Sequence, residues 1–109
     1  MLETILGSLN CERVLVFLVK RGEGYAKEIA DFYEVALSPI QKQLDKLEYG
    51  GVLVSFKKGR TRIYSFNPRY ALLKELQQFL VKALEYYPEN LRDRLTTGRT
   101  RPRRAGKPL

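Results

Sequence analysis

The amino-acid sequence predicts a mainly α-helical fold with one small β-hairpin. Apolar residues recur every three or four positions over residues 2–49 and again over residues 69–87, which is the spacing of amphipathic helices. Between them, residues 52–66 change to β-branched and alternating residues around a glycine-containing turn. The length of 109 residues fits one domain, and 44% hydrophobic with 29% charged residues is ordinary for a globular chain.

The N-terminal part predicts three helices. A first, short amphipathic segment carries Leu2, Ile5, Leu6 and Leu9. A central helix is expected from about residue 11 to residue 21, with Asn10 as its N-cap and with Gly22 and Gly24 ending it. Its apolar residues cover a broad face, so we expect it to be central. A short third helix is expected over residues 25–33.

A fourth helix has the clearest start signal in the chain, the run Ser38-Pro39-Ile40-Gln41. Ser38 can accept a hydrogen bond from a free backbone N–H group, Pro39 suits the first helical position, and Gln41 completes a capping box. We expect this helix to continue to about Tyr49, where Gly50-Gly51 stops it. Its apolar residues form only a narrow stripe, which leaves most of its surface polar.

The C-terminal half predicts a hairpin and then a long helix. Residues 52–56 and 61–66 are expected to be two strands joined by a turn over residues 57–60. Asn67-Pro68 has the composition of a helix start, and a helix with a wide apolar stripe is expected over residues 69–87, ended by Pro88. We therefore expect residues 1–88 to form the folded domain.

Residues 89–109 are expected to be a basic, disordered tail. The chain has 20 Lys and Arg against 12 Asp and Glu, a net charge of +8. From Pro88 onward there are seven basic and two acidic residues, which gives the tail +5 and the remaining chain +3. Such a balance favours a polyanionic partner, and nucleic acid is the commonest one.

The order of these elements is that of a helix-turn-helix followed by a basic wing. A helix fits the major groove of B-DNA, and residues near its N-terminus reach base edges; wings contact phosphates or the minor groove. The glutamines Gln41 and Gln43 can pair bidentately with adenine, and lysine can donate to guanine. Asp45 is unfavourable beside phosphate but can accept from cytosine. The candidate DNA-binding residues are Ser38, Pro39, Gln41, Lys42, Gln43, Lys46, Lys57, Lys58, Arg60 and Arg62.

Residues 40–54, with their Leu-x-x-Leu-x-x-x-Gly pattern, and the wing from Lys57 to Tyr64 resemble the winged helix-turn-helix regulators of the ArsR (arsenical-repressor-like) group. MarR-like and PadR-like families share most of this pattern. The resemblance implies a homodimer that represses transcription from a palindromic operator, with a long C-terminal dimerisation helix. The dimer interface it implies, on the first and last helices, comprises Leu2, Ile5, Leu6, Leu9, Leu72, Leu76, Phe79, Leu80, Ala83 and Leu84.

The sequence argues against a metal site, a cofactor and catalysis. It has no histidine and one cysteine, Cys11, which is too few ligands for the family's usual soft-metal sites. Cys11 is expected to be a buried thiol, and an intersubunit disulfide is the alternative role. We find no catalytic constellation or phosphate loop, so we expect no enzyme activity. The single cysteine favours a cytoplasmic protein, and neither a membrane-spanning segment nor a signal peptide is indicated.

Two other functions are compatible with the same pattern. Glu28, Asp31 and Glu34 form an acidic surface on the third helix, which suits a winged helix used for protein–protein contact. The arginine-rich tail could instead be an RNA-binding arm, or could add non-specific affinity for DNA. The identity of a small-molecule effector, if one exists, does not follow from the sequence.

Overall fold

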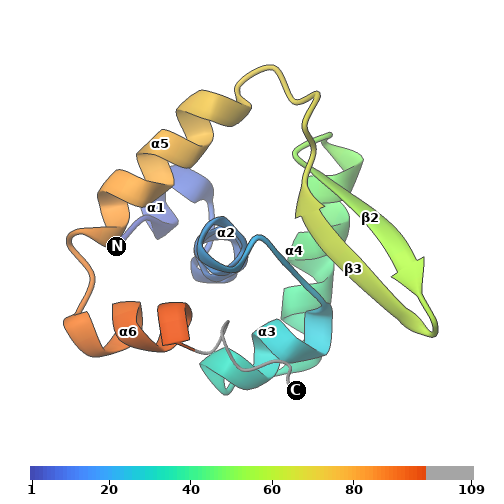
Figure 1. Cartoon of the computed structure of the whole chain (residues 1–109), viewed down its shortest axis with the longest axis horizontal. Coiled ribbons are helices and arrows are strands. Elements are labelled where there is room, and N and C mark those ends of the chain that lie inside the picture. Colours follow the sequence, from blue (N-terminus) through green and yellow to red (C-terminus); the bar gives the residue numbers. More distant parts are fainter. Residues whose placement is uncertain (98–109) are drawn as a thin grey trace.

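The computed structural model describes residues 1–97 and confirms the predicted fold class: helices with one small antiparallel sheet (Figure 1). The elements in chain order are α1 (Glu3–Leu6), α2 (Leu9–Arg21), β1 (Glu23–Gly24), α3 (Ala26–Tyr33), α4 (Leu37–Tyr49), β2 (Leu53–Lys58), β3 (Thr61–Phe66), α5 (Leu73–Leu84) and α6 (Glu89–Thr97).

Helix α2 is the centre of the fold, as its broad apolar face predicts. Figure 1 looks almost along its axis, and the other helices surround it. It contacts α1, α3, α4, α5 and α6 as well as strands β1 and β3. Val14, Val16, Phe17 and Leu18 are fully buried, so α2 supplies the core on which the other elements are placed.

The N-cap of α2 is Ser8, and the prediction of Asn10 was wrong. The Ser8 hydroxyl accepts a hydrogen bond of 3.0 Å from the backbone N–H of Cys11. Gly7, at φ 94°, ends α1 just before it, a conformation that glycine adopts without steric cost. Asn10 instead lies in the first turn of α2 and accepts from the Arg13 guanidinium.

Helix α4 begins at Leu37, one residue before the predicted cap, and the predicted capping box does not form. Its N-cap is Ala36, which makes no side-chain cap hydrogen bond. Pro39 therefore occupies the third helical position. None of the first N–H groups of a helix has an intrahelical partner, so proline is tolerated throughout the first turn and does not mark one position. The end at Gly50 agrees with the prediction.

The sheet has the order β1-β3-β2, with all strands antiparallel. The hairpin is longer than predicted, because Lys58 pairs with Thr61 and only Gly59 and Arg60 form its loop. Strand β1 was not predicted. Its Gly24 lies opposite Tyr64, and a Cβ there would be 2.7 Å from Cε1 of Phe17, so the residue must be glycine for β1 to pack against α2.

Helix α5 is shorter than the predicted helix over residues 69–87. The side chain of Asn67 does accept a hydrogen bond from the N–H of Arg69, but the backbone then forms a turn, and the helix begins only at Leu73. It ends at Leu84, before Pro88. One face of α5 is buried against α2 through Leu80, Ala83 and Leu84.

The assignment of residues 89–97 to a disordered tail was wrong, because they form helix α6. Leu95 is fully buried, and the Arg21 Nε donates a hydrogen bond of 2.9 Å to its carbonyl oxygen. Arg94 lies over the Phe32 ring and donates to the Phe32 carbonyl oxygen at 2.8 Å. The folded domain therefore extends beyond residue 88. The rest of the predicted tail, residues 98–109, lies outside the described residues.

Candidate nucleic-acid interface

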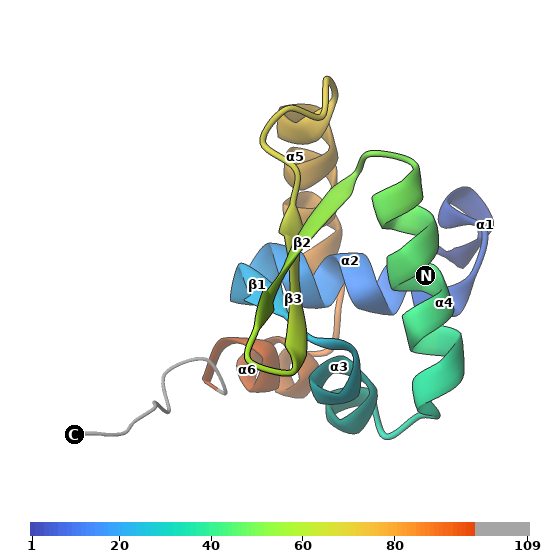
Figure 2. The ribbon, with the colours of Figure 1, turned by 90° about the vertical axis from the view of Figure 1, so that its right-hand side faces the viewer.

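Helix α4 and the β2–β3 hairpin lie side by side and form one face of the molecule (Figure 2). Ile40 and Leu44 turn the inner side of α4 into the core, where both are fully buried. On its outer side, a shallow groove of about 510 Å³ is lined by Leu37, Ser38, Gln41, Lys42 and Asp45. The first two turns of α4 thus present polar side chains on an open surface.

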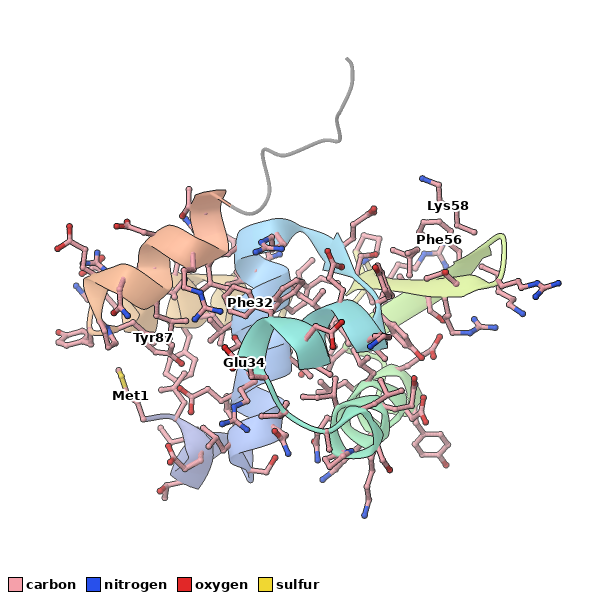
Figure 3. All side chains as sticks on the ribbon, turned by 90° about the horizontal axis from the view of Figure 1, so that it is seen from below. Met1, Phe32, Glu34, Phe56, Lys58 and Tyr87 are labelled. Carbon is pink, nitrogen blue, oxygen red and sulfur yellow. The ribbon has the colours of Figure 1, made fainter. Side chains whose placement is uncertain are left out.

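The hairpin projects from the helical body, and Lys58 lies near its tip, far from Tyr87 (Figure 3). Lys57 pairs directly with Arg62 across the two strands. Opposed like charges destabilise a strand pair unless an anion lies between or beside them. The hairpin carries four cations, which we call the wing cations: Lys57, Lys58, Arg60 and Arg62. None of them forms an ion pair with a carboxylate within residues 1–97. The tip is therefore a concentrated, uncompensated positive charge.

Two hydrogen-bond networks join α4 to the hairpin. In the first, the side-chain amide of Gln41 donates to Asp45 Oδ1 at 2.9 Å and to the Tyr64 hydroxyl at 3.0 Å. The Tyr64 hydroxyl lies 3.4 Å from the same carboxylate oxygen and donates to it. Burial of the ring raises the pKa of Tyr64, so this hydroxyl stays protonated as a donor.

In the second network, Ser55 stands between an acid on α4 and a base on β3. Its hydroxyl donates to Glu48 Oε2 at 2.6 Å and accepts from Arg62 Nη1 at 2.9 Å. Ser55, Tyr64 and Glu48 were not among the residues predicted for this interface. The Gln41–Asp45 pair is visible from its i,i+4 spacing, and strand alternation puts Ser55 and Tyr64 on one face, but only the packed fold shows that this face meets α4.

All ten predicted DNA-binding residues lie on α4 or the hairpin, and eight of them are exposed; Gln41 and Gln43 are half-buried. Ser38, Gln41 and Lys42 come together at the groove. Lys46 does not line it. Its charge instead acts on the Cys11 thiol of α2, where it partly offsets the effect of burial on the pKa of that thiol.

Four of the ten residues in the predicted dimer interface are buried in the chain's own core, which corrects that prediction for them. They are Leu2, Leu80, Ala83 and Leu84. Periodicity predicts which residues share one apolar stripe. Part of that stripe packs against α2 within the same chain, and those residues are not available to a second copy. Leu6 and Leu76 are half-buried against the core. Ile5, Leu9, Leu72 and Phe79 are exposed.

Cys11 is buried, as predicted, and burial raises the pKa of its thiol. Residues 1–97 contain no cluster of three or more His, Cys, Asp or Glu that could hold a metal ion. Within the same residues, no helix is long and apolar enough to cross a membrane.

The acids of α3 are partly neutralised within the chain. The Glu28 carboxylate accepts from the backbone N–H of Tyr25 and lies 3.9 Å from the Arg21 guanidinium. Asp31 pairs with Lys27 at 3.3 Å. Glu34, at the C-terminal end of α3, forms no ion pair with a basic side chain within residues 1–97. This surface is therefore less acidic than the sequence suggests.

Comparisons with known proteins give structural neighbours only. No family model matches the sequence, and no curated protein matches it. YusO from Bacillus subtilis shares the fold with a TM-score of 0.58 and 22% identity, over 80% of this chain and 68% of that one. A doubly substituted ZitR from Lactococcus lactis, in its apo form, gives a TM-score of 0.55 and 18% identity, over 84% of this chain and 72% of that one.

At these identities the neighbours establish the fold and leave the resemblance to the ArsR group a prediction. The element order of this chain, its three-stranded sheet and its basic hairpin directly after α4 are those of a helix-turn-helix followed by a wing. The chain therefore has the winged helix-turn-helix fold.

Proposed function

We propose that this chain is a transcriptional regulator that binds double-stranded DNA sequence-specifically, with α4 in the major groove and the hairpin on the backbone or in the minor groove. One observation carries the proposal: α4, with its open polar groove, lies beside a hairpin whose four cations have no acidic partner in the described chain. Phosphates would supply the counter-charge, and base edges would fill the groove.

The proposed binding mode assigns separate roles to the two elements. Lys57, Lys58, Arg60 and Arg62 neutralise phosphates, which raises affinity for any sequence. Ser38, Gln41 and Lys42 face base edges, which gives discrimination between sequences. Arg62 is held by Ser55, and Ser55 by Glu48 of α4, so the position of the wing depends on that of the reading helix.

We further propose that the regulator acts as a homodimer and represses transcription. The predicted interface residues that the fold leaves exposed support a second copy packed against α1, the start of α2 and α5; they are Ile5, Leu9, Leu72 and Phe79. Two copies would present two α4 helices to half-sites about one helical turn apart. Repression is what the resemblance to the ArsR group implies, and a reporter gene with the selected site in its promoter tests it.

Replacement of both Lys58 and Arg60 by alanine tests the mode of binding. Duplexes selected from a random library by the wild-type chain are titrated by fluorescence anisotropy at several salt concentrations. The variant should bind about tenfold or more weakly, and the slope of log K against log salt should fall by about two units, since two phosphate contacts are lost. The loss should be similar for selected and unselected duplexes.

The control is Lys74→Ala, which also removes exposed positive charge but from α5. It should change affinity and slope far less than the wing variant. If the wing variant and the control lost equal affinity, binding would depend on the net charge of the chain and not on the hairpin. Undiminished binding by the wing variant would refute the proposed mode.

The two alternative functions have distinct readouts. An RNA-binding arm predicts that truncation after residue 97 removes RNA binding and leaves duplex DNA binding intact. A protein-interaction module predicts unchanged duplex binding when the wing cations are removed. Glu28 pairs with Arg21 and Asp31 pairs with Lys27, which argues against an acidic docking surface on α3.

A further inference from the structure

The hydrogen bonds of Gln41 restrict what its side chain can offer to a base. A carboxylate can only accept, so the atom of Gln41 that lies 2.9 Å from Asp45 Oδ1 must be the amide nitrogen. The same nitrogen donates to the Tyr64 hydroxyl at 3.0 Å. A side-chain amide has two N–H donors, and both are used within the chain.

What remains free on the side chains of Gln41 and Asp45 is acceptors. The Oε1 of Gln41 and the Oδ2 of Asp45 accept no hydrogen bond from any residue within 1–97. Both side chains line the groove at the start of α4, where Asp45 is exposed. Buried Tyr64 holds the arrangement, because its hydroxyl bonds both partners and its ring is packed in the core.

In the major groove, only cytosine and adenine offer an amino group to an acceptor. Guanine presents two acceptors, N7 and O6, and thymine presents O4 with a methyl group. Adenine places its N7 acceptor beside the amino group, where it would face a second acceptor and a negative charge. Cytosine has a C–H group there instead. Bidentate reading of adenine also needs a free amide N–H, which Gln41 lacks.

We propose that Gln41, Asp45 and Tyr64 form an acceptor-only reading unit that selects cytosine at one position of each half-site. For Gln41, this proposal replaces the pairing with adenine that a glutamine side chain can otherwise make. Gln41 and Asp45 contact the base, and Tyr64 is a positioning residue. The inference rests on the proposed function, since it requires α4 to enter the major groove of DNA.

The test is selection of bound sequences from a random duplex library by the wild-type chain and four variants. Gln41→Ala identifies the base position that the unit reads, because preference should be lost there. At that position the wild type should enrich cytosine. Asp45→Ala frees the amide of Gln41 and should shift the ratio of adenine to cytosine upward, on the order of tenfold.

Tyr64→Phe tests the same idea without changing charge. It keeps the ring in the core and releases one amide N–H, so it should shift the preference toward adenine in the same direction. Asp31→Ala is the charge-matched control for Asp45→Ala, because it removes an exposed carboxylate from α3. It should retain cytosine.

The outcomes separate this inference from the proposed function. The inference alone is overturned if the wild type selects a defined sequence with adenine at the position read by Gln41. It is also overturned if the cytosine preference survives both Asp45→Ala and Tyr64→Phe. Failure of the wild type to enrich any sequence overturns the proposed function, and the reading unit with it.

Discussion

At the scale of single residues, one carboxylate organises the junction between α2 and the end of α5. Glu12 is only 3% exposed, and its Oε1 accepts a hydrogen bond of 2.8 Å from the Leu2 backbone N–H. The Tyr87 hydroxyl donates to its Oε2. Nearby, the Tyr33 hydroxyl donates to the Arg13 carbonyl oxygen at 2.9 Å. Burial is the main cause that raises the pKa of both Tyr33 and Tyr87, and the negative charge of Glu12 adds to it.

These tyrosines predict a loss of stability in alkali. Because their folded-state pKa values lie above the ordinary value of 10.0, the folded chain holds the phenolic protons more tightly than the unfolded chain. Their contribution is complete below that value and is lost as the pH rises through the folded-state pKa values. The free energy of unfolding, measured by urea titration, should be lower at about pH 11 than at about pH 9.

The double variant Tyr33→Phe/Tyr87→Phe keeps both rings and should lose less stability over the same interval, although its stability at neutral pH is lower because two hydrogen bonds are missing. Tyr49→Phe is the control, since that ring is 96% exposed, and it should follow the wild type. A double variant with the same alkaline loss as the wild type would contradict this assignment.

At the scale of elements, helix α6 shows how a polar segment is held by its contacts. It carries Arg92, Asp93 and Arg94 and has few apolar residues. It is held because Leu95 enters the core against α2, while Arg21 binds carbonyl oxygens at its C-terminal end. Arg94 in turn reaches the end of α3. The helix therefore braces the helix-turn-helix from the side opposite the hairpin.

Leu95→Ala tests whether α6 belongs to the folded domain. Removing a fully buried leucine side chain should lower the free energy of unfolding by about 2–5 kcal/mol. Chemical denaturation monitored by circular dichroism measures this. The control Arg92→Ala changes an exposed residue of the same helix and should stay within about 0.5 kcal/mol of the wild type. Equal stability of both variants would show that α6 is not part of the cooperative unit.

At the scale of the whole molecule, two parts of the surface bear on function: a basic face, and the exposed apolar residues of α1 and α5. The basic face comprises α4 and the hairpin, and the exposed apolar residues of α1 and α5 include Ile5, at 72% exposed, and Phe79. Exposed apolar residues of this kind on a small domain are typical of a protein–protein interface. The proposed dimer would cover them and leave both reading helices open.

Phe79→Glu is expected to convert the dimer into a monomer, because it places a charge in an interface that must lose water. Analytical ultracentrifugation over a range of chain concentrations measures the mass. Phe56→Glu is a matched control: Phe56 is 48% exposed, against 38% for Phe79, but lies on the hairpin. It should leave the mass unchanged. A wild-type chain that is monomeric throughout would refute the proposed dimer.

The sequence by itself determined the kinds of elements and their order. Periodicity located the helices around residues 9–21 and 37–49 and the hairpin, since hydrogen-bonding geometry and side-chain spacing are local properties. The same local patterns assigned all ten candidate DNA-binding residues to one helix and the hairpin that follows it. They also set the basic tip, whose four cations lie within six positions of the chain.

Only the tertiary structure decided which faces are covered and which polar groups are free. Leu2 and Leu80 share their periodicity with exposed neighbours, yet both are buried, because α2 covers one side of the stripe. Strand β1 and helix α6 are held by partners 40 or more residues away, so no local pattern marks them. Likewise, Tyr64 lies 23 positions from Gln41, and their hydrogen bond occupies one of the two N–H donors of the Gln41 amide.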